Sequence, residues 1–264
     1  IGSCDPGATK RGDYAMLDIV GWNYGANYRQ FRNRYPDKPA LYSESASALS
    51  EYGWYAERLA TNKTDYALNV KRVDSYDRNA APWSDIPDVE FWRMETDRDI
   101  GGEFVWTGSD YLGEPTPYNP HQSEWKGTPR RELARSSYFG IFDLAGFPKD
   151  RYWLYKAQWR PDVPSAHILP HWNWAGREGE ITPVHVYTSG DEAELFVNGV
   201  SQGRERRREH QYRFRWDDVK YAPGELRVKT WRKGRVWAED VVRTAGEPAR
   251  VARCERRFGR LTFV

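Results

Sequence analysis

The sequence predicts an α/β region followed by an all-β region. In the first 160 residues, short apolar runs alternate with helical stretches, which indicates parallel β/α units. After about residue 165, short strands separated by turn residues predict a β-sandwich. The 264 residues have 39% hydrophobic and 30% charged side chains, which is ordinary for a globular protein with a sizeable core.

Each of the three predicted strands in the first region is followed by polar or aromatic residues that could take part in binding or catalysis. They are 16–21 (MLDIVG), 39–43 (PALYS) and 102–107 (GEFVWT), with helices predicted at 27–34, 88–97 and 149–159. Functional groups of barrel enzymes gather at the C-terminal ends of such strands, but a closed barrel needs eight. The region is therefore either an open sheet or the last three strands of a barrel.

The second region has four predicted strands, 184–188, 194–197, 212–216 and 226–231, with turns at 189–191, 198–199 and 223–224. Asn198-Gly199 is the strongest hairpin signal, because both turn positions need positive φ. Residues 260–264 (RLTFV) indicate a strand of a further domain. We therefore expect three units: 1–160, 165–245, and 248–264 as the start of a truncated β domain.

Charge and composition exclude several classes of function. A net charge of +2 is too balanced for a polyanion binder, and the basic run 204–208 (RERRR) is predicted to be a solvated hairpin tip. No apolar run approaches the ~18 residues of a membrane span. Cys4 and Cys254 form no disulfide framework, and His167, His171 and His185 lack zinc-ligand spacing. We expect no metal, no cofactor, no nucleic acid and no membrane.

The aromatic content is unusually high, with 13 Trp and 17 Tyr. Such rings can serve as core residues, and they also suit the C–H faces of sugars. Glu44 ends the second predicted strand and is followed by small residues, 45–47, which leave room for a substrate. A strand-end carboxylate of this kind can act as the nucleophile of a retaining glycosidase.

Five segments resemble the β-galactosidase-like members of glycoside hydrolase family 2, in order and over nearly the whole chain. They are 38–50 (KPALYSESASALS), 102–118 (GEFVWTGSDYLGEPTPY), 136–150 (SSYFGIFDLAGFPKD), 167–174 (HILPHWNW) and 194–199 (ELFVNG). The resemblance implies the last strands of a (β/α)8 TIM barrel followed by an immunoglobulin-like β-sandwich.

The resemblance also implies roles for individual residues. Glu44 matches the nucleophile, and Tyr24 matches the tyrosine beside it, with Asn23 as the alternative because the register is uncertain by one residue. Trp106 matches the floor of the sugar subsite. Asp110, at the same barrel mouth, is expected to bond a sugar hydroxyl or to orient a neighbour. His121, in the following polar loop, either reaches the substrate or is exposed.

One departure from the family matters. The family's acid/base glutamate follows an Asn, and no Asn-Glu dipeptide occurs in this sequence. Glu51, Glu103 and Glu114 are the nearby carboxylates, and none is assigned to this role. The simplest account is that the chain is a fragment that lacks the acid/base and is weakly active or inactive alone.

Three hypotheses follow. The first is retaining hydrolysis of terminal β-galactosides through a covalent glycosyl-enzyme on Glu44, with β-glucuronidase as the alternative of the same family. The second is a non-catalytic carbohydrate-binding or scaffold fragment, with a sugar platform at Trp172, Trp174, Trp231 or Trp237. The third adds homo-oligomerisation through the aromatic face of the sandwich. A bacterial, periplasmic or secreted origin is suspected from the resemblance.

Overall fold

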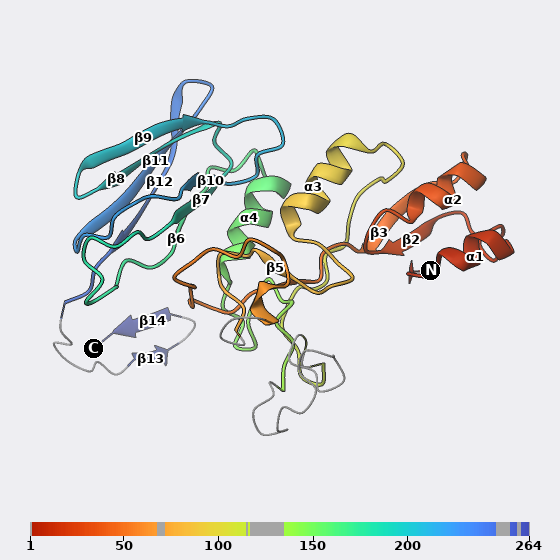
Figure 1. The fold of residues 1–264 in the computed structure, drawn as a ribbon, viewed down its shortest axis with the longest axis horizontal. Helices are drawn as coiled ribbons and strands as arrows, with labels where there is room; N and C mark the ends of the chain where they lie inside the picture. Colours follow the sequence, from red (N-terminus) through yellow and green to blue (C-terminus); the bar gives the residue numbers. More distant parts are fainter. Residues whose placement is uncertain are drawn as a thin grey trace.

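The computed structural model describes residues 2–67, 72–114, 116 and 135–246, and the backbone of two further strands. These parts are rich in sheet and poorer in helix. Figure 1 shows the first strands and helices at one end of the molecule, the antiparallel sheets at the other, and two helices between them. The further strands, β13 (Cys254–Arg257) and β14 (Arg260–Phe263), pair antiparallel.

A small parallel sheet forms the N-terminal end, in the order β1 (Gly2–Ser3), β2 (Val20–Asn23) and β3 (Ala40–Glu44). Residues 101–104 extend this sheet along the free side of β3. There the amide of Tyr42 donates to the carbonyl of Gly102 at 2.8 Å, and the amide of Phe104 donates to the carbonyl of Tyr42 at 2.8 Å. The parallel arrangement expected for the three apolar runs is therefore observed.

Two strand boundaries were wrong. The first strand begins at Val20 rather than at residue 16, because Met16 lies outside the core with 92% of its surface exposed. The 102–107 segment is not a continuous strand, since it pairs with β3 through an isolated parallel bridge between Tyr42 and Glu103.

Two of the helices pack with this sheet, and two lie between it and the second region (Figure 1). They are α1 (Pro6–Arg11), α2 (Tyr28–Arg34), α3 (Pro87–Thr96) and α4 (Asp150–Trp159). The last three confirm the predicted helices within a residue or two, whereas α1 was not predicted. Short elements lie between α2 and α3: β4 (Ala48–Leu49), a 3-10 turn (Asp65–Ala67) and β5 (Asn79–Ala80).

Aromatic side chains fill the cores. Tyr28 and Phe31, three residues apart on α2, are both fully buried beside Trp22 of β2 and Tyr42 of β3. Spacing of three to four residues places side chains on one helix face, so α2 buries its aromatic stripe against the sheet. The high aromatic content is therefore used largely in the interior.

Two antiparallel sheets pack face to face in the second region. One has the order β10 (Phe214–Trp216), β7 (Val184–Thr188), β6 (Ala166–Leu169). The other has the order β12 (Arg235–Arg243), β11 (Glu225–Arg232), β8 (Glu192–Val197), β9 (Val200–Arg206). A single apolar cluster joins both sheets, including Val186, Phe214, Leu195 and Val228. The four predicted strands are confirmed, and β6, β9 and β12 were missed.

Burial patterns show how the sandwich is placed. In β8 and β11 buried and less buried residues alternate, as expected for strands with one face on a core. Every residue of β7 is buried, because its second face packs against the rest of the chain: Tyr187 joins Leu154 and Tyr155 of α4 in one cluster.

The basic run 204–208 is largely solvated as expected, since Arg204, Arg206 and Arg208 are exposed, but it does not form a hairpin tip. Its first residues belong to β9, and the Arg204 guanidinium stacks 3.8 Å from the ring centroid of Trp231. Arg207 donates to the carbonyls of Gly190 at 2.8 Å and Gln211 at 2.7 Å. Arg204 and Arg207 therefore serve packing and backbone hydrogen bonding within the sandwich.

The predicted Asn198-Gly199 turn joins β8 and β9, with φ of 50° and 81°. The Asn198 side chain also holds the turn before β11. Its Oδ1 accepts from the Glu225 amide at 2.8 Å, and its Nδ2 donates to the Pro223 carbonyl at 3.0 Å. Gly224 lies beneath this amide with φ of 132°, and an added Cβ would stand 2.0 Å from the Asn198 Oδ1.

We predict that Gly224→Ala lowers the free energy of unfolding by about 2–3 kcal/mol, because it combines an unfavourable φ with loss of the Asn198 contacts. Gly234→Ala is the matched control, since its φ is 75° and open space surrounds its Cβ position; we expect a loss of about 1 kcal/mol. Urea unfolding of both variants measures the difference, and equal losses would contradict the bridging role of Asn198.

Candidate active site

Glu44 is the last residue of β3 and is half-buried. The register between β2 and β3 shifts at this point: Trp22 pairs with Tyr42, whereas Asn23 pairs with Glu44. Ser43 is the extra residue, and its hydroxyl donates to the Asn23 Oδ1 at 2.6 Å. This bulge aims the Glu44 side chain beyond the strand end, as bulges near active sites do.

Tyr24 is the residue that contacts Glu44. Its backbone adopts φ of 61°, its amide donates to the Glu44 carbonyl at 2.9 Å, and its hydroxyl donates to the Glu44 Oε2. Burial and the adjacent Glu44 carboxylate raise the pKa of Tyr24 well above its ordinary value. The phenol therefore stays protonated and available as a donor. The structure places Asn23 against Ser43 instead.

The small residues after Glu44 do not line an open space. Ser45, Ala46 and Ser47 are all fully buried. The amide of Ser45 donates to the Phe104 carbonyl at 3.0 Å, and the carbonyl of Ser47 accepts from the Ala81 amide at 2.9 Å. Their size admits neighbouring backbone, so the expected room for substrate is not at these positions.

Trp106 is half-buried and follows the segment that pairs with β3. Its ring meets the ring of Tyr111 edge-on, with centroids 5.8 Å apart, and it packs against a buried cluster that includes Leu49 and Phe139. The Trp106–Thr107 peptide is cis. One side of the indole is therefore fixed by packing.

Tyr111 forms a second tyrosine–carboxylate pair, which sequence reasoning missed. Its hydroxyl donates to the Glu114 Oε2. Burial, the Glu114 bond and the charges of Glu114 and Glu44 raise the pKa of Tyr111. The Glu114 charge likewise contributes to raising the pKa of Tyr24. Glu44, Tyr24, Tyr111 and Glu114 thus lie within electrostatic reach of one another.

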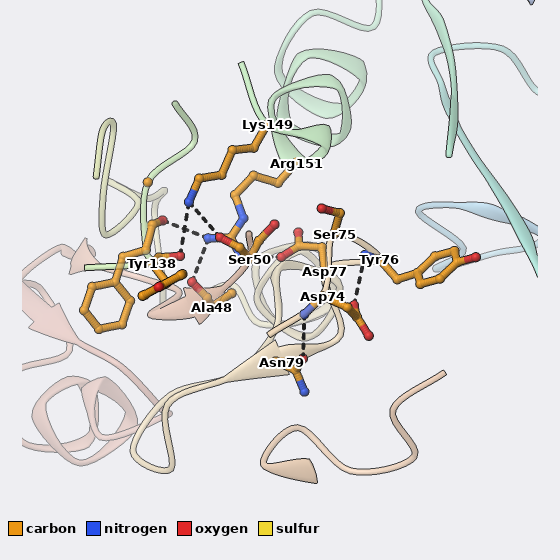
Figure 2. Close-up of polar contacts among 12 residues, drawn as sticks. Ala48, Ser50, Asp74, Ser75, Tyr76, Asp77, Asn79, Tyr138, Lys149 and Arg151 are labelled. Carbon is orange, nitrogen blue, oxygen red and sulfur yellow. Dashed lines mark hydrogen bonds and ion pairs between the residues drawn. The ribbon is translucent and has the colours of Figure 1, made fainter. Parts of the chain in front are cut away.

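Asp110 lies in a buried ion pair. Its Oδ1 accepts from the Gly140 amide at 2.7 Å, and its Oδ2 is 2.5 Å from the Lys149 ammonium. Lys149 also donates to the Ser50 carbonyl at 2.7 Å, as Figure 2 shows. Burial lowers the pKa of Lys149 to about 8, against the attraction of Asp110. Both Asp110 oxygens are therefore committed to holding the loop, which supports the orienting role over the hydroxyl-binding one.

The other nearby carboxylates point elsewhere. Glu51 pairs with Arg72, and Glu103 accepts from the indole of Trp159 at 3.1 Å. Burial raises the pKa of Glu103. His121 lies outside the described residues.

The described residues contain no group of three metal-binding side chains. His167 contacts Asp150 at 2.6 Å through its Nε2. His185 is fully buried, which lowers its pKa to about 4.

No helix of the described residues is long and apolar enough to cross a membrane.

The expected aromatic platform of the sandwich is largely covered. Trp172 is fully buried in the sandwich core, so its inclusion was wrong. Arg204 covers Trp231, and Trp174 stacks on His171 with centroids 4.3 Å apart. The indole of Trp237 donates to the Ser189 hydroxyl at 2.7 Å.

Comparison with known proteins gives relatives of one kind. The chain is 40% identical over 247 residues to "Beta-galactosidase BoGH2A" of Bacteroides ovatus, covering 89% of this chain and 27% of that protein. It is 27% identical over 264 residues to a "Putative beta-glucuronidase" of Formosa agariphila, covering 89% of this chain and 24% of that protein. The chain thus spans about a quarter of the length of these relatives. Residues 179–238 match the family described as "Domain of unknown function (DUF4982)".

Solved structures agree with this fold. A β-glycosidase from Bacteroides vulgatus matches with a TM-score of 0.70 and 28% identity, over 91% of this chain and 32% of that one. A glycosyl hydrolase family 2 member from Bacteroides cellulosilyticus matches in fold with a TM-score of 0.67 and 22% identity, over 97% of this chain and 31% of that one.

We predict that Asp110→Asn lowers the free energy of unfolding by about 3 kcal/mol at pH 7, because it leaves the Lys149 ammonium buried without its partner. The folded-state pKa of Lys149, about 8, lies below the ordinary 10.5, so unfolding takes up a proton between these values. The contribution of Lys149 to the free energy of unfolding therefore increases as the pH rises through this window. The destabilisation caused by Asp110→Asn becomes smaller over the same range.

Thermal or urea unfolding at pH 7 and pH 9.5 checks this prediction. Asp143→Asn is the matched control: Asp143 accepts from the amides of Ala145 at 2.9 Å and Phe147 at 2.8 Å, and it bonds no cation among the described residues. We expect it to cost about 1 kcal/mol, with no such change between the two pH values. A stable Asp110→Asn protein would refute the structural role of the ion pair.

Proposed function

The chain belongs to glycoside hydrolase family 2, and on this premise we propose that it carries the nucleophile of a retaining β-glycosidase that cleaves terminal β-galactosides. The observation that carries the proposal is the hydrogen bond from Tyr24 to Glu44 across the ends of two adjacent parallel strands. Sequence motifs alone could not distinguish Tyr24 from Asn23. The bulge at Ser43 supports Tyr24 as the partner of the carboxylate.

The proposed reaction has two steps. Glu44 attacks the anomeric carbon and forms a glycosyl-enzyme ester, while the bond to the leaving oxygen breaks and that oxygen takes a proton from a second carboxylic acid. Water, deprotonated by the same group, then attacks the anomeric carbon and releases Glu44. The proton donor must face Glu44 at about 5–5.5 Å. We propose that it lies in the remainder of a longer protein, so that this chain alone is weakly active or inactive.

The neighbours of Glu44 receive roles that follow from their contacts. Tyr24 stabilises the ionised carboxylate before attack and orients the oxygen that does not attack. Asn23 fixes the bulge through Ser43. The face of Trp106 that is free of Tyr111 forms the floor of the sugar subsite, and Asp110 orients the loop. His121, outside the described residues, is proposed to line the same cleft.

The fold is proposed to have the same organisation. Residues 1–160 supply the last strands of a (β/α)8 barrel, residues 165–245 an immunoglobulin-like sandwich, and residues 248–264 the start of a further β domain. The parallel pairing of β2, β3 and residues 101–104 supports the first assignment, and the two packed antiparallel sheets support the second.

Two alternative functions are less well supported than β-galactoside hydrolysis. A β-glucuronidase is suggested by more distant relatives, whereas the 40% identical relative is called a β-galactosidase. A purely sugar-binding role for the sandwich is less favoured, because Trp172 is buried and Arg204 covers Trp231. We further propose association into homo-oligomers through the aromatic face of the sandwich, and a periplasmic or secreted location in a bacterium.

We predict that Glu44→Gln lowers kcat by a thousandfold or more, because the amide cannot form the glycosyl ester. Hydrolysis of aryl β-galactoside, β-glucuronide, β-mannoside and β-glucoside by the complete gene product containing this chain provides the measurement. Glu239→Gln is the control, since Glu239 pairs with Lys229 at 3.4 Å in the sandwich. Activity unaffected by Glu44→Gln would sink the assignment.

We predict that Tyr24→Phe lowers kcat by about a hundredfold, because one donor to the reacting carboxylate is lost, and that it changes KM by less than about threefold. Tyr28→Phe is the matched control, because the Tyr28 hydroxyl donates to Asp97 at 2.8 Å on the helix side of the sheet. Steady-state kinetics of both variants tests the role, and equal kcat values in the two would refute it.

A further inference from the structure

A cavity of about 390 Å³ lies where the sandwich packs on α4 through β6 and β7 (Figure 1). Its volume is within the range of sites that hold small molecules, roughly 300–1,000 Å³. Its walls come from the loop after β4, the start of α4, β6 with the residues that follow, and β12. The aromatic and titratable side chains that line it are Tyr52, Tyr55, Asp150, Trp153, His167 and His171. The described lining includes none of the residues assigned to the candidate active site, so this cavity is a separate place for a small ligand.

The polar groups of this cavity are held in fixed positions. The Oδ2 of Asp150 accepts from the Tyr55 hydroxyl at 2.5 Å, and its Oδ1 is 2.6 Å from the His167 Nε2. The Nδ1 of His171 accepts from the Asn173 amide at 3.2 Å, and burial lowers the pKa of His171. At neutral pH this ring is therefore uncharged and carries its proton on Nε2. The cavity wall thus combines an oriented carboxylate with an oriented N–H donor, and groups of these two kinds bond sugar hydroxyls.

Aromatic rings form much of the remaining wall. Trp153 stacks on His167 with centroids 5.1 Å apart, and the Lys156 ammonium lies 4.7 Å from the Trp153 centroid. Tyr52 is 59% exposed although it lines the cavity, which places it at the opening, and its ring contacts that of Phe147, which is 57% exposed. Tyr52 rather than Trp153 therefore offers an exposed ring. Such a ring beside directed polar groups suits a pyranose, whose C–H face packs on the ring while its hydroxyls bond the polar groups.

We propose that this cavity is an accessory, non-catalytic binding site for a neutral oligosaccharide. One pyranose residue lies in the cavity against Tyr52, and the next residue along the saccharide lies on Phe147. Two adjacent exposed rings favour a chain of sugars over a single one. The described lining contains no lysine or arginine, so a carboxylated sugar would meet the Asp150 carboxylate without a cation to balance its charge. The inference goes beyond the proposed function, because it does not depend on Glu44.

The test is calorimetric titration of the complete gene product, in a Glu44→Gln background that slows hydrolysis. The probes are neutral tetrasaccharides of β-linked galactose, glucose, mannose and xylose, with tetragalacturonate as the charged comparison. We expect at least one neutral tetrasaccharide to bind, and Tyr52→Ala to raise the Kd of one binding event about tenfold because the exposed ring is lost. His171→Phe keeps a ring beside Tyr55 and Trp174 but removes the N–H donor, so it should raise the same Kd about fivefold.

Trp92→Ala is the matched control, because Trp92 is 44% exposed on α3 and does not line the cavity. It should leave every Kd unchanged, and Tyr52→Ala in the Glu44 protein should keep its kcat/KM for aryl β-galactoside. Unchanged affinity in a folded Tyr52→Ala protein overturns the inference. So does tighter binding of tetragalacturonate, failure of every neutral tetrasaccharide to bind at millimolar concentration, or a matching fall in aryl β-galactoside hydrolysis, which would place Tyr52 in the active site. A wild type inactive on all aryl glycosides overturns the proposed function and leaves this inference standing, because binding is measured separately.

Discussion

Two cations buried at the start of α4 are the constraint on which the centre of the molecule depends. Lys149 and Arg151 are each 1% exposed, and a buried charge must be met by hydrogen-bond acceptors. Arg151 donates to the carbonyls of Ala48 at 2.6 Å and Phe139 at 2.8 Å, and pairs with the buried Asp77 (Figure 2). The helix therefore fastens three segments far apart in sequence, none of which contains much regular structure.

These contacts explain how the candidate site can be positioned by segments that contain little regular secondary structure. Lys149 forms an ion pair with Asp110, and Asp110 accepts a hydrogen bond from the Gly140 amide. These two contacts fix the loop that carries Tyr111 and Trp106. From the other side, Arg213 of the sandwich donates to the carbonyl of Tyr76 at 2.7 Å and pairs with Asp88. Positioning by supporting contacts of this kind is what an active site on loops requires.

Periodicity and turn chemistry predicted α2, α3, α4 and the sandwich strands β7, β8, β10 and β11, because most of these elements bury one face. The motif around Glu44 predicted the strand end but not which neighbour meets the carboxylate, since a one-residue bulge at Ser43 decides it. Small residues at 45–47 suggested open space, yet they are buried beneath backbone that only the tertiary fold brings there. Glu114 was recognised as a nearby carboxylate, but its bond to Tyr111 was not predicted, because that contact is likewise a property of the fold.

The buried cations and the paired tyrosines solve opposite electrostatic problems. Around α4, positive charges are removed from water and compensated by carbonyls and Asp77, so this region is fixed. At the strand ends, two carboxylates are left with neutral phenolic partners, Tyr24 and Tyr111, which bond them without neutralising them. A guanidinium or ammonium in place of Tyr24 would form an ion pair with Glu44, which keeps the carboxylate ionised but lowers its basicity. The buried cations therefore hold the supporting segments in place, while a neutral phenol holds the Glu44 carboxylate.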